Sequence, residues 1–263
     1  METVAQAIRA ALLTGEPRAK VMAARRVARD WRLGRLRAEF DVAMPERPRW
    51  PESLELLPPN RMPKRGRGGS LKNRIALWHS LAHIEFVAID LALDRAGRFG
   101  GEMGERFTGD FLAVAADEAM HFALIERKLA SLGAHYGSLP VHGGLWEAAH
   151  ETRHDVAARL AVVPMVLEAR GLDVTPATLN RVRASGDLSG ARILERILDD
   201  EIRHVAVGAR HFHDVCHTRD EAPCKLWQNL VKTHFRGALK PPFNDSARHD
   251  AGLTQEFYAV IAS

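Results

Sequence analysis

The sequence predicts an all-α fold, and two observations support that prediction. No stretch of about four to eight residues alternates apolar and polar side chains between turn residues, as a half-buried strand would. Helix-favouring Ala, Leu and Arg are plentiful, whereas aromatic residues make up only 6% of the chain. With 263 residues, 46% of them hydrophobic, the chain can bury the core of one large helical domain or two small ones.

Residues 1–69 are expected to form a basic helical extension that ends in an arm. Helices are predicted over 2–13 and 17–40, separated by a Gly-Glu-Pro sequence that interrupts helical structure. Residues 41–69 contain six prolines and three glycines, so we expect an extended arm there.

The N-terminal segment is also unusually basic. Residues 1–74 hold 17 Lys and Arg against 8 Asp and Glu, so the rest of the chain is net acidic although the whole carries +4. Such a segment can bind nucleic acid or an acidic partner. Arg25-Arg26 and the stretch from Arg61 to Arg67 lack the interleaved aromatic residues of a base-stacking surface, so we expect a solvated surface and keep nucleic-acid binding as the alternative.

Residues 70–217 are predicted to form a four-helix bundle, on which residues 218–263 pack as a C-terminal helix and tail. The four helices are expected over 70–96, 108–132, 145–170 and 189–216. Ser70 is a good N-cap for the first helix, and a glycine follows each of the first three at positions where helices commonly end.

Two details modify this scheme. The connection over 133–144 is short for a crossover along a bundle, so the third helix is expected to start later than Leu145 or to bend at Pro164. A further short helix is predicted between the third and fourth, with Thr175 as N-cap and Pro176 at its first position.

An internal repeat carries most of the functional information. Each copy has a lone Glu in an apolar helical segment, then an Asp-Glu-x-x-His motif whose Glu follows 33 residues later. The first copy is Glu85, Asp117, Glu118 and His121, and the second copy is Glu168, Asp200, Glu201 and His204. Every residue of the second copy lies 83 positions after its counterpart.

The repeated residues have the chemistry of a two-metal site. Each Glu projects from an apolar helix face, where an ionised carboxylate without a counter-charge is very costly. Two divalent cations would neutralise four such carboxylates, and the i, i+3 spacing directs each Glu-x-x-His pair toward one metal. We therefore predict that Glu85, Glu118, His121, Glu168, Glu201 and His204 bind the metals.

The aspartates of the motif are predicted to support the imidazole ligands. A metal-bound imidazole usually donates its other N–H to a carboxylate. Asp200 is expected to reach His121, and Asp117 is expected to reach His204. Asp90 and Asp173 also match at an offset of 83, as either supporting or structural residues.

Glu-x-x-His alone is a weak signal in this chain. Glu147 with His150, and Glu151 with His154, have the same spacing but polar neighbours, so we expect a solvated helix start there. His79 and His83 lie off the Glu85 face, and we expect structural roles for them.

These motifs resemble the ferritin-like superfamily of carboxylate-bridged di-metal proteins. The chain is most similar to a bacterial ferritin-like family that carries only a domain-of-unknown-function label. The matching stretches are Ala82–Phe86, Ala116–Phe122, Tyr136–Pro140, Val163–Asp173, Asp200–His204 and Pro241–Asn244. On the metal motif alone, the chain also resembles ferritin-like tRNA-modifying hydroxylases. The resemblance implies the fold more firmly than the reaction.

The expected function is that of a di-iron oxidoreductase, a hydroxylase or oxidase that uses dioxygen, an external electron donor and an organic substrate. Glu118 and Glu201 would bridge the metals, and Glu85 and Glu168 would be terminal ligands. Manganese or a mixed pair would suit the same ligands. The alternatives are a rubrerythrin-like peroxidase using hydrogen peroxide, a tRNA-directed hydroxylase and a non-enzymatic iron-binding protein.

The same residues suggest a cytoplasmic location. Cys216 and Cys224 are too few for a disulfide framework. No run of about 18 apolar residues predicts a membrane span, and the N-terminus lacks the basic-then-apolar pattern of a signal peptide.

Overall fold

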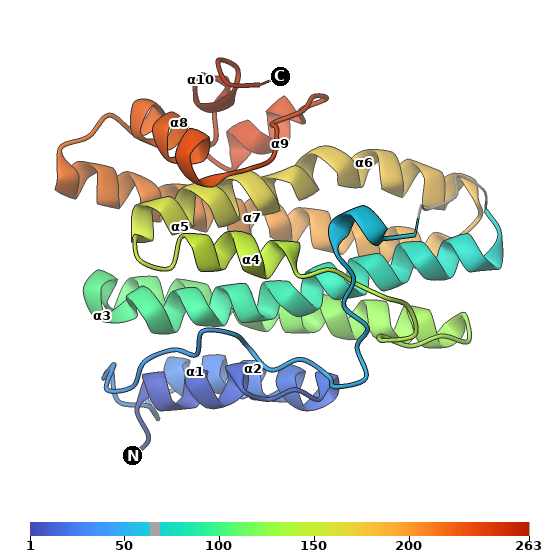
Figure 1. The fold of residues 1–263 in the computed structure, drawn as a ribbon, viewed down its shortest axis with the longest axis horizontal. Helices are drawn as coiled ribbons and strands as arrows, with labels where there is room; N and C mark the ends of the chain where they lie inside the picture. Colours follow the sequence, from blue (N-terminus) through green and yellow to red (C-terminus); the bar gives the residue numbers. More distant parts are fainter. Residues whose placement is uncertain (64–68, 263) are drawn as a thin grey trace. The chain divides into compact units, whose positions relative to one another are not determined.

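The computed structural model describes residues 1–63 and 69–262, and these residues confirm an all-α fold (Figure 1). Within them there is no strand, and β-type pairing is limited to two isolated bridges, Thr3 with Arg37 and Leu56 with Val141. The contacts divide the chain into two compact units, Met1–Trp146 and Glu147–Ser263. The three-part division of the chain expected from the sequence stays a prediction.

In the first unit, α1 (Val4–Leu12) and α2 (Pro17–Arg32) pack against each other and against α3 (Leu71–Ser131). Thr3 and Gln6 form a capping box at the start of α1. The predicted helix over 17–40 was too long, since α2 ends at Arg32. Gly34 then adopts a φ of 63°, and the following segment pairs with the start of α1 through the Val4 N–H and the Arg37 carbonyl, 2.9 Å apart.

The arm after α2 is largely without regular structure. One short 3-10 helix, η1 (Pro59–Arg61), interrupts its described part. The remaining part of the predicted arm, residues 64–68, lies outside the described residues.

The helix α3 is two helical arms folded back at Gly104, where φ is 86° and ψ is −178°. A straight helix of 61 residues would place Glu85 and His121 about 50 Å apart, yet their side chains are in contact at 3.2 Å. Ser70 caps the first arm as predicted. The predicted end at Gly97 was wrong, because Gly97 is helical and leaves room for the side chains of Met44 and Ile8.

In the second unit, the predicted helix over 145–170 is interrupted. After α4 (Gly144–Glu151), which spans the boundary between the units, the chain restarts as α5 (Val156–Val162), capped by the Asp155 carboxylate. A π-helical segment, η2 (Val163–Glu168), follows. Pro164 has no N–H for the usual helical hydrogen bond, and it lies in this wider turn; the predicted bend at Pro164 stays a prediction.

The helix α6 (Ala169–Ala184) corrects two predictions. It runs through Gly171, where an end was predicted, and through Thr175 and Pro176, where a new helix was expected to start. Pro176 cannot donate to the Leu172 carbonyl, and the Asn244 side-chain amide donates to that oxygen instead, at 3.1 Å. A residue distant in the sequence thus provides the hydrogen bond that Pro176 cannot donate to the Leu172 carbonyl, and the helix continues.

The remaining elements are α7 (Leu188–Arg219), α8 (Pro223–His234), α9 (Asp245–Asp250) and α10 (Gln255–Tyr258). Helix α7 packs against α5, η2 and α6, while α8 packs against α5 and α10. Helix α9 contacts α6 and α7, so the C-terminal segment covers the helices of its own unit.

By length and composition alone, α3 could cross a membrane, and it is the one helix in residues 1–63 and 69–262 that passes this test. Within its apolar stretch, however, 67% is buried inside the protein, as in the core helix of a soluble protein.

Candidate metal centre

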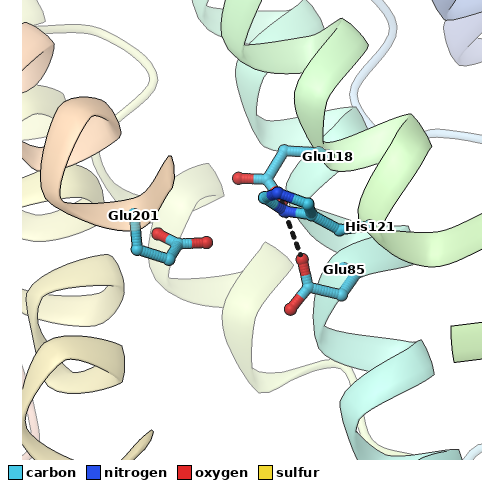
Figure 2. A group of neighbouring side chains, drawn as sticks. All are labelled: Glu85, Glu118, His121 and Glu201. Carbon is cyan, nitrogen blue, oxygen red and sulfur yellow. Dashed lines mark hydrogen bonds and ion pairs between the residues drawn. The ribbon is translucent and has the colours of Figure 1, made fainter. Parts of the chain in front are cut away.

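The two arms of α3 bring three predicted ligands together. Glu85 lies on the first arm, and Glu118 and His121 lie one turn apart on the second. All three are buried, with 4%, 1% and 0% of their surface exposed. Figure 2 shows the imidazole of His121 directed at Glu85. We call these three residues the first half-site.

The atomic arrangement of the first half-site suits a divalent cation. His121 Nδ1 lies 3.2 Å from an oxygen of Glu85 and 3.3 Å from an oxygen of Glu118. One ligand atom from each of the three residues lies within 4.8 Å of the other two. Imidazole nitrogen with carboxylate oxygen is a donor set that iron, manganese and zinc accept.

The side chains around the first half-site are apolar. Phe86, Phe122, Ala115 and Ile125 lie within one or two helical turns of the ligands and are 0–2% exposed. Carboxylates buried in such surroundings need a counter-charge, which an imidazolium or a metal ion can provide. His121 Nδ1 would carry a proton when it donates to a carboxylate, and a metal would replace that proton.

The second half-site, Glu168, Glu201 and His204, occupies the equivalent positions of the second repeat. Glu168 is the last residue of η2, and Glu201 and His204 lie one turn apart on α7, which packs against η2. His204 Nδ1 is 3.8 Å from an oxygen of Glu201. Figure 2 also labels Glu201 on its helix. Glu168, a predicted ligand, thus lies in a π-helical turn, and such turns occur frequently at functional sites.

The aspartates of the motif have different surroundings. Asp200 is 1% exposed and accepts hydrogen bonds from Arg196, at 2.6 Å, and from Arg203 on the same helix. Asp117 is half-buried and borders a cleft of about 1150 Å³ beside α2. The expected contacts of Asp200 with His121 and of Asp117 with His204 stay predictions.

The hydrogen bonds of His79 and His83 agree with the structural roles expected for them. The Nε2 atom of His79 accepts hydrogen bonds from the N–H groups of Gly137 and Leu139, at 2.9 and 3.3 Å. His83 contacts the Tyr136 hydroxyl at 2.8 Å and the His142 carbonyl at 2.9 Å. Burial lowers the pKa of each imidazole to about 4, so both are neutral near pH 7.

Glu151, from another Glu-x-x-His pair, makes a surface interaction. Glu151 forms an ion pair with Arg236 at 3.1 Å, and both side chains are exposed. Such exposed pairs contribute little to stability. The solvated character predicted for Glu151 therefore agrees with the structure.

The sequence did not reveal which residues pair with Asp90 and Asp173. Asp90 binds Lys20 of α2, and Asp173 binds Arg248 of α9. Neither pairing has a local spacing signal, because the partners are 70 and 75 residues apart.

Comparisons with known proteins place the chain in a family. A family model described as "Protein of unknown function (DUF455)" matches residues 13–259. An uncharacterized protein of Haemophilus influenzae is 41% identical over 212 residues, which cover 78% of this chain and 73% of that protein. No solved structure shows a significant match. Because the family model matches nearly the whole chain, the protein belongs to the DUF455 family.

Proposed function

We propose that this protein is a di-metal oxidoreductase of the ferritin-like type, with two iron ions, or manganese in one or both positions. The metals would be held by both half-sites, within a four-helix bundle formed by the two arms of α3, by η2 with α6, and by α7. The observation that carries the proposal is the buried imidazole of His121, whose Nδ1 atom lies close to the carboxylates of both Glu85 and Glu118.

Charge balance supports two metals rather than one. The first half-site contains two buried carboxylates, Glu85 and Glu118, and its repeat supplies two half-buried ones, Glu168 and Glu201. Four carboxylates carry four negative charges, which two divalent cations neutralise without further groups. The two imidazoles provide one nitrogen ligand for each metal.

The protein residues would have distinct roles. Glu118 and Glu201, each paired with a His at i+3, are proposed as bridging ligands, and Glu85 and Glu168 as terminal ligands. Bound iron would supply the redox chemistry, reducing dioxygen with electrons from an external donor and oxidising a substrate C–H bond. The apolar side chains around Glu85 and Glu118 would exclude water from the centre.

Metal analysis with a matched control tests the proposal. We expect anaerobically purified protein to bind about two irons per chain. Glu118→Ala should lose this iron, and oxygenation should give a transient absorbance in the wild type but not in Glu118→Ala. Glu126→Gln is the control, because Glu126 lies on the same arm of α3 and accepts a hydrogen bond from the Tyr136 N–H at 2.9 Å. Wild-type protein without metal after reconstitution, or equal iron in Glu118→Ala, would contradict the proposal.

The same protein can distinguish the related alternatives. Faster oxidation of the reduced centre by hydrogen peroxide than by dioxygen would indicate a rubrerythrin-like peroxidase. A hollow multimer of about 24 chains in light scattering would indicate iron storage.

A tRNA-directed hydroxylase is the second candidate, favoured by the cleft beside α2. Arg25, Arg29 and Arg32 line this cleft together with Trp31, which combines positive charge with a ring on which a base can stack. Binding to tRNA should weaken as salt concentration rises. Absence of binding at low salt would remove this candidate.

A further inference from the structure

Two buried aspartates occupy equivalent positions beside the candidate ligands. Asp90 lies five residues after Glu85, and Asp173 lies five residues after Glu168. Five residues turn a helix by about 140° beyond one full turn, so each aspartate points away from the face that carries the glutamate. Each ligand helix therefore has a carboxylate ligand on one side and a buried aspartate near the opposite side.

In the first unit, the N-terminal extension supplies the cation for Asp90. Lys20 of α2 donates to one oxygen of Asp90, and the indole N–H of Trp50 donates to the other at 2.9 Å. The ammonium of Lys20 also lies 3.4 Å from the Leu12 carbonyl and 5.1 Å from the centre of the Phe86 ring. Both charged side chains of the pair are completely buried.

In the second unit, the C-terminal segment supplies the buried cation for Asp173, while the half-exposed Arg170 of α6 lies 3.5 Å from the same carboxylate. Arg248 of α9 donates two hydrogen bonds to this carboxylate, at 2.8 and 2.7 Å, and the backbone N–H of Asn244 donates a third at 3.0 Å. The guanidinium of Arg248 also lies over the rings of Phe243 and Tyr258. The ion pair is buried, with side-chain exposures of 2% and 0%.

Stability alone does not explain two such pairs. Burial raises the pKa of Asp90 to about 6, even though Lys20 and Trp50 act in the opposite direction. Desolvation is therefore only partly compensated, and apolar residues of similar size often replace a buried ion pair without loss of stability. In some proteins, a buried ion pair instead fixes the rotation and axial position of its helix, because each charge needs a specific partner.

We propose that Asp90 and Asp173 are positioning residues for the metal centre, and that the N-terminal and C-terminal segments are equivalent clamps. Each clamp delivers one buried cation to the outer side of one ligand helix. Each clamp thereby sets the rotation and axial position of the helix that carries Glu85 or Glu168, and so the position of that glutamate at the metal. This inference rests on the proposed function, since it assigns the two glutamates as ligands.

Apolar replacement of each ion pair tests the clamps. The variants are Lys20→Met with Asp90→Leu, and Asp173→Leu with Arg248→Met. The control is Arg183→Met with Glu195→Leu, which removes an exposed ion pair between α6 and α7 that belongs to neither clamp. The probe is Co²⁺, titrated anaerobically and followed by its visible absorption, and circular dichroism measures the folded fraction of the metal-free proteins.

The expected result separates positioning from stability. Both clamp variants should remain helical and bind Co²⁺ about tenfold more weakly or worse, whereas the control should stay close to the wild type. If a clamp variant does not fold, Asp90→Glu and Asp173→Glu keep the charge but move it by one methylene, and they should weaken Co²⁺ binding in the same direction.

Two outcomes would overturn the inference in different ways. Folded clamp variants that bind Co²⁺ as the wild type does would show that the ion pairs are structural only, and the proposed function would stand. Wild-type protein that binds no Co²⁺ would refute the proposed function, and the clamps with it.

Discussion

At the scale of single residues, the centre of the account is one buried imidazole. His121 contacts two buried carboxylates, those of Glu85 and Glu118. Burying ionised carboxylates in an apolar core is costly unless a positive charge compensates them. Asp94, also buried on α3, has Arg98 as a partner at 2.8 Å. The two kinds of carboxylate should respond differently when their charge is removed.

We expect Glu118→Gln to abolish metal binding while changing the stability of the metal-free protein by no more than about 1 kcal/mol, because glutamine keeps the side-chain volume and an oxygen that can accept a hydrogen bond from His121 Nδ1. Asp94→Asn should instead destabilise the protein, because it leaves Arg98 without its ion-pair partner. Urea unfolding with a chelator measures both. A large loss of stability in Glu118→Gln would indicate a structural role for Glu118.

The neutral state of His79 predicts a pH dependence. Burial, assisted by the nearby His135, lowers the pKa of His79 from 6.5 to about 4. Between pH 6.5 and pH 4, His79 is therefore protonated in the unfolded chain but neutral in the folded chain. The free energy of unfolding consequently falls as pH decreases from about 6.5 toward 4. His79→Gln keeps an acceptor for the Gly137 N–H but does not titrate.

The difference in unfolding free energy between wild type and His79→Gln should therefore depend on pH. The wild type should lose about 1–2 kcal/mol more than the variant between pH 7 and pH 4.5, after allowance for partial solvent access. Parallel stability curves for the two proteins would show that His79 is not the titrating group.

At the scale of elements, the π-helical turn of η2 depends on a glycine of the neighbouring helix. A Cβ atom added to Gly208 of α7 would collide with the ring of Pro164. The contact brings α7 close to the segment that ends at Glu168. Glycine spacing alone could not have predicted this contact, because the proline lies 44 positions earlier in the sequence.

Gly208→Ala should therefore destabilise the protein by about 1–3 kcal/mol, since neither backbone nor proline ring can move freely. Gly171→Ala is the matched control, because Gly171 is also helical but has open space around it. The control should be neutral or slightly stabilising, by up to about 1 kcal/mol. Thermal unfolding of the two variants compares them directly, and equal stability would contradict the packing argument.

The helix boundaries show where sequence reasoning succeeds and where it fails. Ser70 begins α3 as predicted, because a capping side chain acts on its own neighbours. Gly97 and Pro176 have the sequence signals of helix boundaries, yet the helices continue through both. Met44 packs on Gly97, and the Asn244 amide donates to the Leu172 carbonyl, to which Pro176 cannot donate. A glycine or proline therefore does not end a helix where a tertiary contact supplies the packing or hydrogen-bond partner that the local sequence lacks.

At the scale of the whole molecule, the repeat in the sequence reappears in each unit. In both, a Glu precedes an aspartate by five residues and a Glu-x-x-His pair lies on another helical arm. The candidate ligands could be predicted because their spacing is fixed by the helical turn. Lys20 and Arg248 could not, because their contacts with the aspartates are set only by the packing of the terminal segments.

The central claim is that six side chains, three from each repeat, hold two metal ions. Crystallography of iron-reconstituted protein, with anomalous diffraction measured at the iron absorption edge, tests it most directly. The account predicts two peaks about 3.5–4 Å apart, one bound by His121 and the other by His204, with Glu118 and Glu201 between them. No peak, or an iron bound away from these residues, would contradict it.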